Sequence, residues 1–137
     1  MKVFVDANIL VSVLNKEYPS FSYSSRVLSL NDLPGFDIYT SPVCLAIAFY
    51  FSEKKSGNAL ARKKMGALCD NLHVAECGRT AVLQTAANPR IHDFEDGLEY
   101  YSALQAGCKC IVTEDMEDFY FSDLEVLRAR DFLGKYL

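Results

Sequence analysis

Short runs of apolar residues alternate along this chain with longer segments in which apolar and polar residues are mixed. The short runs are rich in β-branched and aromatic residues, which favours strands, and Gly, Pro, Asn and Asp separate them from the longer segments. The expected strands are 2–6, 37–40, 72–76, 108–113 and 125–127. The expected helices are 7–14, 19–30, 42–51, 56–70, 80–88, 93–107 and 131–137. This alternation predicts an α/β fold with a mostly parallel sheet covered by helices.

The expected helix at 42–51 has a well-defined start. The hydroxyl of Ser41 can accept a hydrogen bond from the first turn, and Pro42 suits the first helical position. This helix is almost wholly apolar, so we expect it to be buried. The next helix, 56–70, is amphipathic, and its expected apolar side carries Leu60, Met65 and Leu68.

The totals predict one globular domain spanning 1–137. Half of the 137 residues are hydrophobic and 23% are charged, which gives enough apolar surface for a core. No apolar run approaches the roughly 20 residues of a membrane-spanning helix, and no secretory leader precedes the first strand. We therefore expect a cytoplasmic protein without membrane contact. The five cysteines are odd in number and lack a paired Cys-x-x-Cys pattern, which favours reduced, mostly buried thiols. A zinc site at Cys69-x-x-x-His73-x-x-x-Cys77 is disfavoured, because this spacing matches no established zinc pattern.

The net charge of −4 argues against a protein that coats nucleic acid non-specifically, because such proteins need a basic surface. It does not exclude a nuclease, whose acids are neutralised by bound metal. The one basic stretch, Arg62-Lys63-Lys64, has two interpretations. A solvated helix face is favoured over a nucleic-acid contact, and the sequence leaves both open.

The acids carry the functional signal. Two apolar strands run straight into acids, at Asp6 and at Glu114-Asp115, and Asp96 falls in the first turn of the helix before the second of these strands. Carboxyl ends of parallel strands meet at the edge where open α/β sheets bind ligands. Carboxylates gathered there repel one another unless a cation lies between them. The pattern therefore predicts a divalent-metal site, and phosphodiester hydrolysis is the reaction that fits it best.

Each acid also has a structural interpretation. Asp93 is a good N-cap, and acids in a first turn favour the positive end of the helix dipole. Asp96, Glu99 and Ala103 share one side of the helix, so Asp96 can point toward the strand ends. Asp118 follows in a loop where acids are commonly only solvated.

The order of these acids resembles that of the PIN domain family, in particular its VapC-like toxin ribonucleases. The matching segments are Val3-Phe4-Val5-Asp6-Ala7-Asn8, Asp93-Phe94-Glu95-Asp96-Gly97, and Ile111-Val112-Thr113-Glu114-Asp115 with Asp118-Phe119. The resemblance implies a Rossmann-like three-layer α/β/α domain and Mg²⁺- or Mn²⁺-dependent cleavage of RNA. By position, it implies that Asp6, Asp96 and Asp115 bind the metal and that Asp118 supports them as a further catalytic residue.

Supporting roles follow for three neighbours of these acids. Asn8 can orient Asp6, Thr113 can donate its hydroxyl to a carboxylate or a water, and Asp93 can orient the attacking water. Toxins of the resembled kind are inhibited by a small antitoxin protein, so the resemblance also implies such a partner. Aromatic residues could serve that contact or a homodimer, although core packing is the favoured interpretation; they are Phe49, Tyr50, Phe51, Tyr100 and Tyr101.

The chain departs from the resembled pattern at one position. Such nucleases carry a glutamate in the helix after the second strand, and here that position holds Ile47. The next acid, Glu53, lies about 9 Å further along a helix and points elsewhere. A non-cleaving module of the same fold, which binds RNA or a protein, is therefore the main alternative. A haloacid-dehalogenase-like phosphatase is disfavoured, because Asp6-Ala7-Asn8 lacks its second acid. A response-regulator receiver is disfavoured because its paired acids and phosphoacceptor aspartate do not occur.

Overall fold

The computed structural model of the protein describes residues 1–137, and its centre is a five-stranded parallel sheet in the order β3-β2-β1-β4-β5. The strands are β1 Lys2–Val5, β2 Asp37–Thr40, β3 His73–Val74, β4 Cys110–Val112 and β5 Glu125–Leu127. The helices are α1 Ala7–Leu14, α2 Ser20–Ser29, α3 Pro42–Ser56, α4 Asn58–Cys69, α5 Arg79–Ala87, α6 Phe94–Ala106 and α7 Ala129–Tyr136. Short 3₁₀ turns follow α2 (Leu30–Asp32) and β4 (Met116–Phe119).

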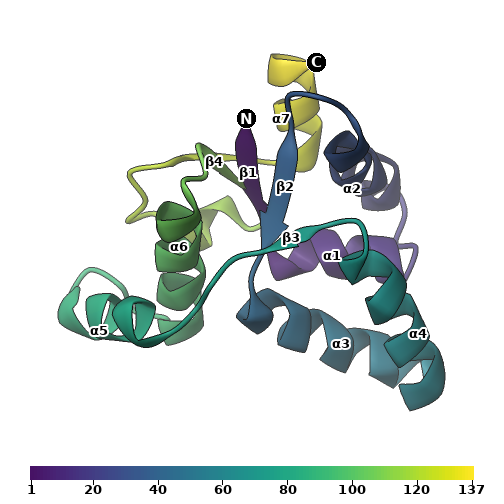
Figure 1. Cartoon of the computed structure of the whole chain (residues 1–137), viewed down its shortest axis with the longest axis horizontal. Helices are drawn as coiled ribbons and strands as arrows, with labels where there is room; N and C mark the ends of the chain where they lie inside the picture. Colours follow the sequence, from purple (N-terminus) through teal and green to yellow (C-terminus); the bar gives the residue numbers. More distant parts are fainter.

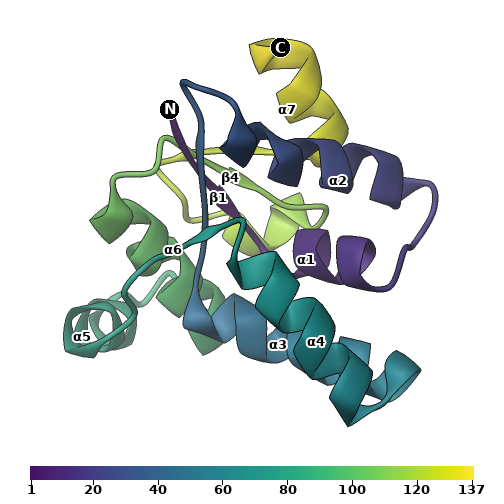
Figure 2. The same ribbon diagram turned by 45° about the vertical axis from the view of Figure 1, so that its right-hand side comes forward.

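Helices cover both faces of the sheet. Helices α2 and α7 pack against each other on one side of the strands, and α6, with α5 packed outside it, lies on the other (Figures 1 and 2). Helices α3 and α4 lie beyond the carboxyl ends of β1 and β2, with α3 against α1 (Figure 1). The predicted three-layer α/β/α architecture with a parallel sheet is confirmed.

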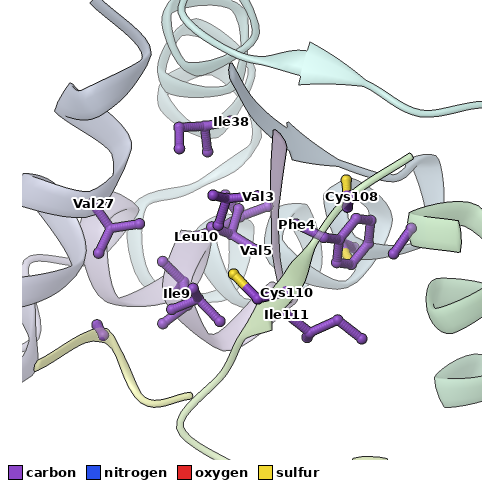
Figure 3. Packing of buried hydrophobic residues seen from close by; sticks show 14 of the residues in the cluster. Val3, Phe4, Val5, Ile9, Leu10, Val27, Ile38, Cys108, Cys110 and Ile111 are labelled. Atoms are coloured by element: carbon purple, nitrogen blue, oxygen red, sulfur yellow. The ribbon is translucent and has the colours of Figure 1, made fainter. Parts of the chain in front are cut away.

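The core follows the alternation of side chains along β1. Val3 and Val5 point toward the face that packs on Leu10 and Val27, and Phe4 points to the opposite face (Figure 3). All five of these residues are completely inaccessible to water. Burying a side chain of this size contributes about 1.5–3 kcal/mol, so β1 anchors both halves of the molecule.

The expectation that the helix at 42–51 is buried was wrong. The helix α3 begins at Pro42 as predicted, with the Ser41 hydroxyl accepting from the Cys44 N–H at 3.2 Å, but it extends to Ser56. Only one stripe of it is buried, at Cys44, Ala48 and Ser52. Tyr50 and Phe51 are 55% and 44% exposed, because the contacts of α3 with α1, α4 and α6 leave these two side chains uncovered.

The apolar side of α4 was predicted only in part. Leu68 is buried as expected, but Leu60 is 45% exposed and the small residue Ala61 takes the inward position. The chain turns from α3 into α4 at Gly57, whose φ of 84° is reached without strain only by glycine. This turn sets the direction of α4 and directs Leu60 outward.

Several predicted ends hold, while others move. Helix α6 starts after the Asp93 cap and ends at Gly107, which adopts the left-handed conformation with φ of 81°. Strand β3 is shorter than predicted, because only two residues of this edge strand pair with β2. Helix α7 begins at Ala129 rather than at Asp131. None of the helices combines the length and apolar character that crossing a bilayer requires.

The cysteines and the basic stretch have local roles. All five cysteines are free, and His73 stacks on Tyr39 with its Nε2 3.4 Å from Asp37. In the basic stretch, Lys64 donates to the Leu14 carbonyl at 3.1 Å. The Arg62 side chain donates to Asn58 of its own helix. Because Arg62 and Lys64 contact groups of their own chain, the basic stretch Arg62-Lys63-Lys64 is better interpreted as a solvated helix face than as a nucleic-acid contact.

Candidate active site

Asp6 lies where the sheet divides. Strand β1 is central, with β2 on one side and β4 on the other, and Val5 is in register with Val112. The strand stops at Asp6, which becomes the N-cap of α1 and accepts the Ala7 N–H at 2.6 Å. Ligands of open α/β sheets bind at such a switch point, outside the carboxyl ends of the strands. Asp6 therefore occupies the position that the fold makes available for a ligand.

Thr113 and Asn8 tie the end of β1 to the end of β4. The Thr113 hydroxyl donates to one oxygen of Asp6 at 2.8 Å and accepts the Asp115 N–H at 3.0 Å. The Asn8 amide donates to both Asp6 and Asp115 at 3.3 Å, and its oxygen accepts the Glu114 N–H at 3.1 Å. Two carboxylates predicted to act together are thus connected through the two polar residues predicted to orient them.

The first turn of α6 brings Asp96 to the same edge. Asp93 caps the helix by accepting the Asp96 N–H at 3.1 Å. Gly97 follows, and its bare Cα lets α6 pack closely on α5 near Thr85. Asp96 is half-buried, and its pKa is raised to about 7 by burial and by the negative charges of neighbouring acids, Asp93 first among them.

Asp115 and Asp118 lie at the outer rim. Both are exposed, and Asp118 belongs to the 3₁₀ turn Met116–Phe119. The pKa of Asp118 is raised by partial burial and then by the charge of Asp115. Asp118 is thus close enough to the other acids for their charges to raise its pKa, and it remains accessible to water.

Glu99, one turn beyond Asp96 on α6, is an acid at this site that sequence reasoning did not select. Its side chain is 2% exposed, and Cys44 of α3 donates its thiol to one carboxylate oxygen at 2.8 Å. Burial, and then the charge of Asp6, raise the pKa of Glu99 to about 10. Burial and the same two acids raise the pKa of Cys44 above its ordinary value. The available signal was the three-residue spacing from Asp96.

Ligand atoms of Asp6, Cys44 and Glu99 lie within 4.8 Å of one another, which no other trio of metal-ligating side chains achieves. The predicted metal trio of Asp6, Asp96 and Asp115 is spread more widely across the same cavity. Their role as ligands stays a prediction.

These residues line one cavity of about 660 Å³, a size typical of ligand sites. Nine of its sixteen lining residues are Asp or Glu, and none is Lys or Arg. The nine acids are Asp6, Glu17, Asp93, Glu95, Asp96, Glu99, Asp115, Glu117 and Asp118. Such a set of oxygen ligands without a compensating side-chain cation suits a hard divalent metal such as Mg²⁺ or Mn²⁺.

Helix α3 brings no acid into this cavity. Ile47 lines it, at the position where the sequence pattern lacks a glutamate. Glu53 points elsewhere and accepts from the Asn58 amide. The favoured core-packing interpretation of the aromatic residues holds for Tyr100, which is buried, but not for Tyr50 and Phe51, which are exposed, and Phe51 lines the cavity.

Comparison with known proteins identifies the family to which a chain with this site belongs. A sequence model described as PIN domain matches residues 2–117. Ribonuclease VapC1 of Aquifex aeolicus (strain VF5) is 27% identical over 139 residues, which cover 98% of this chain and 95% of that protein.

Two solved structures share the fold. VapBC2 from Rickettsia felis, bound to a DNA fragment from its promoter, superposes with a TM-score of 0.71 at 18% identity, over 93% of this chain and 98% of that chain. Mycobacterium tuberculosis VapC20, a toxin that cleaves the sarcin–ricin loop, gives a TM-score of 0.63 at 15% identity, over 80% and 86%.

Proposed function

Because this chain belongs to the PIN domain family, we propose that it is a metal-dependent endoribonuclease and the toxin of a bacterial toxin–antitoxin pair. One observation carries the proposal: the strand ends and the start of α6 form a cavity that holds nine carboxylates and no Lys or Arg. The likeness over nearly the whole chain to a protein named Ribonuclease VapC1 supports RNA as the substrate.

The residues of the cavity fit a divalent cation. The pKa values of Asp96 and Asp118 are raised by burial and then by the charges of neighbouring acids, and the positive charge of a bound metal would offset both effects. Asp6, Asp96 and Asp115 are the residues that would hold Mg²⁺ or Mn²⁺. When bound, the cation would supply Lewis acidity at the scissile phosphate and at the attacking water.

The chain's own groups position the reaction. Thr113 and the Ala7 N–H hold both oxygens of Asp6, so its carboxylate enters the cavity in one orientation. Asn8 fixes Asp115 relative to Asp6 across the sheet. Asp118 at the exposed rim orients the attacking water, and Asp93 keeps the first turn of α6, and so Asp96, in place.

The test is cleavage of a panel of single-stranded and structured RNAs by the purified protein with Mg²⁺, Mn²⁺ or EDTA. Asp6→Asn keeps an oxygen that can accept the Ala7 N–H, so the variant should fold. We expect it to lose metal-dependent cleavage by about 100-fold or more, as for removal of a charged group that acts in the transition state. Asp70→Asn, which changes an exposed acid away from the cavity, is the matched control and should cleave like the native protein.

Ile47 supports an alternative, a PIN-fold module that binds RNA or a protein without cutting. This alternative predicts that the native protein binds the RNA panel with no cleavage in either metal. Cleavage that persists in EDTA, or in Asp6→Asn, would instead refute the metal site built on Asp6.

The surface beside the cavity fits an antitoxin partner. Tyr50 and Phe51 expose apolar area on α3, and Phe51 also lines the acidic cavity. A protein segment with apolar side chains for this surface and one Arg or Lys for the acids would block the site. Inhibition of cleavage by the protein encoded next to this one, and its loss in Phe51→Ala, would support this role.

A further inference from the structure

Glu99 belongs to α6, but its carboxylate lies beside α3. It projects from α6 and reaches Cys44 of α3, to which its carboxylate is hydrogen-bonded at 2.8 Å. Ile47 is three residues beyond Cys44, so it lies one turn further along the same side of α3. The Glu99 carboxylate thus lies against the stretch of α3 from which an acid is missing.

The contacts of an ionised Glu99 within the protein do not compensate for its burial. A carboxylate has about four acceptor sites, and Glu99 receives one weak donor, the Cys44 thiol. Its second oxygen has no donor from the protein, and Glu99 is among the residues that line the cavity. A carboxylate oxygen of another acid, Asp6, lies within 4.8 Å of it. Two buried carboxylates this close to each other are both ionised only when a cation lies between them, and otherwise one of them keeps a proton.

We propose that Glu99 is a metal ligand, and that it supplies from α6 the carboxylate that α3 lacks. It binds the divalent cation together with Asp6, while the Cys44 thiol fixes the orientation of its carboxylate. This inference rests on the proposed metal-dependent nuclease. It deepens that function by placing the cation at the buried inner end of the cavity, where the ligand atoms of Asp6 and Glu99 lie within 4.8 Å of each other.

A purely structural role for Glu99 makes a different prediction. A protonated Glu99 would donate a hydrogen bond to Asp6, and a glutamine amide could donate the same bond. Glu99→Gln would then leave metal binding intact. If Glu99 binds the cation, the same variant loses a charged oxygen ligand of nearly identical size.

The experiment is calorimetric titration of the full chain with Mn²⁺ alone, without RNA. We expect Glu99→Gln to weaken Mn²⁺ binding by about 10- to 100-fold or more, since even outer residues of metal sites have effects of that size. Glu76→Gln, at an exposed position, is the matched control and should bind like the native protein. Native-like Mn²⁺ affinity in Glu99→Gln would overturn the inference and leave the nuclease standing. Absence of Mn²⁺ binding in the native protein would overturn both.

Moving the carboxylate provides a second test. Ile47→Glu, introduced into Glu99→Gln, returns an acid to the cavity from α3. We expect this double variant to regain most of the lost Mn²⁺ affinity, and no recovery would refute the view that Glu99 replaces an α3 acid. If Glu99→Gln fails to fold, Glu99→Asp serves instead. It keeps the charge but withdraws the carboxylate by one methylene, so weaker Mn²⁺ binding supports the inference and unchanged binding refutes it.

Discussion

Glu99 should make the metal-free protein less stable as the pH rises, and Glu99→Gln should remove that dependence. Its folded pKa of about 10 lies above the ordinary value of 4.5 that it recovers on unfolding. Between these two values the folded state keeps a proton that the unfolded state releases. Raising the pH therefore favours unfolding. Only below about pH 4.5, where Glu99 is protonated in both states, does this residue no longer destabilise the folded state.

The size of the effect follows from one proton. A full difference of one bound proton lowers the free energy of unfolding by about 1.4 kcal/mol for each pH unit. From pH 6 to pH 8 the loss is at most about 2.7 kcal/mol, and about 1–2.5 kcal/mol is expected because Asp6 shares the same buried charge. That is a large part of the roughly 5–15 kcal/mol that stabilises a typical domain.

Urea unfolding in EDTA at pH 6, 7 and 8 measures this slope. The native protein and Glu76→Gln should both lose stability over the range, while Glu99→Gln should lose clearly less. Asp96, whose folded pKa is about 7, also lowers the stability of all three proteins as the pH rises toward 7. Because this contribution is common to them, the difference in slope between the native protein and Glu99→Gln is due to Glu99. Parallel slopes in the native protein and Glu99→Gln would refute the assignment of a retained proton to this residue.

Three further predictions concern packing, orientation and metal. Gly97→Ala places a methyl group 2.4 Å from the Thr85 side chain and should cost about 1–3 kcal/mol in urea unfolding, whereas Gly66→Ala, in open space on α4, should gain about 0.5–1 kcal/mol. Thr113→Val removes the donor to Asp6 and should weaken Mn²⁺ binding about 10-fold by calorimetry, with native affinity contradicting its orienting role. Mn²⁺ at 100 times its dissociation constant should raise the free energy of unfolding by about 2.7 kcal/mol, and no change in the urea midpoint would contradict a metal site.

The sequence predicted well those helix ends that are determined by neighbouring residues, such as caps and stop signals. The Asp93 cap and the Gly107 stop determine where α6 begins and ends, and Ser41 with Pro42 starts α3. The order of acids also located the cavity, because Asp6 follows β1 directly and parallel strands end at one edge. These are relations between residues close in sequence, combined with one general rule of α/β sheets.

The errors share a different cause. An apolar segment shows that a helix has surface to bury, but not which of its sides receives a neighbour. For this reason α3 was expected to be buried, although Tyr50 and Phe51 are exposed, and Leu60 was assigned inward where Ala61 lies. Both errors depend on how α3 and α4 are oriented against the rest of the fold. No local sequence pattern specifies that orientation.

Glu99 shows why a motif is an incomplete description of such a site. The sequence pattern requires an acid at the position of Ile47, and by that criterion the site is short of a carboxylate. A metal responds to where oxygen atoms lie in space, whichever helix carries them, and the long glutamate side chain can reach across from α6 to α3. The same buried acid that destabilises the metal-free protein is the one that a cation would stabilise most. Under the proposal, Ile47 on α3 and the buried Glu99 on α6 are therefore two parts of one arrangement, in which the carboxylate reaches the metal from a different helix.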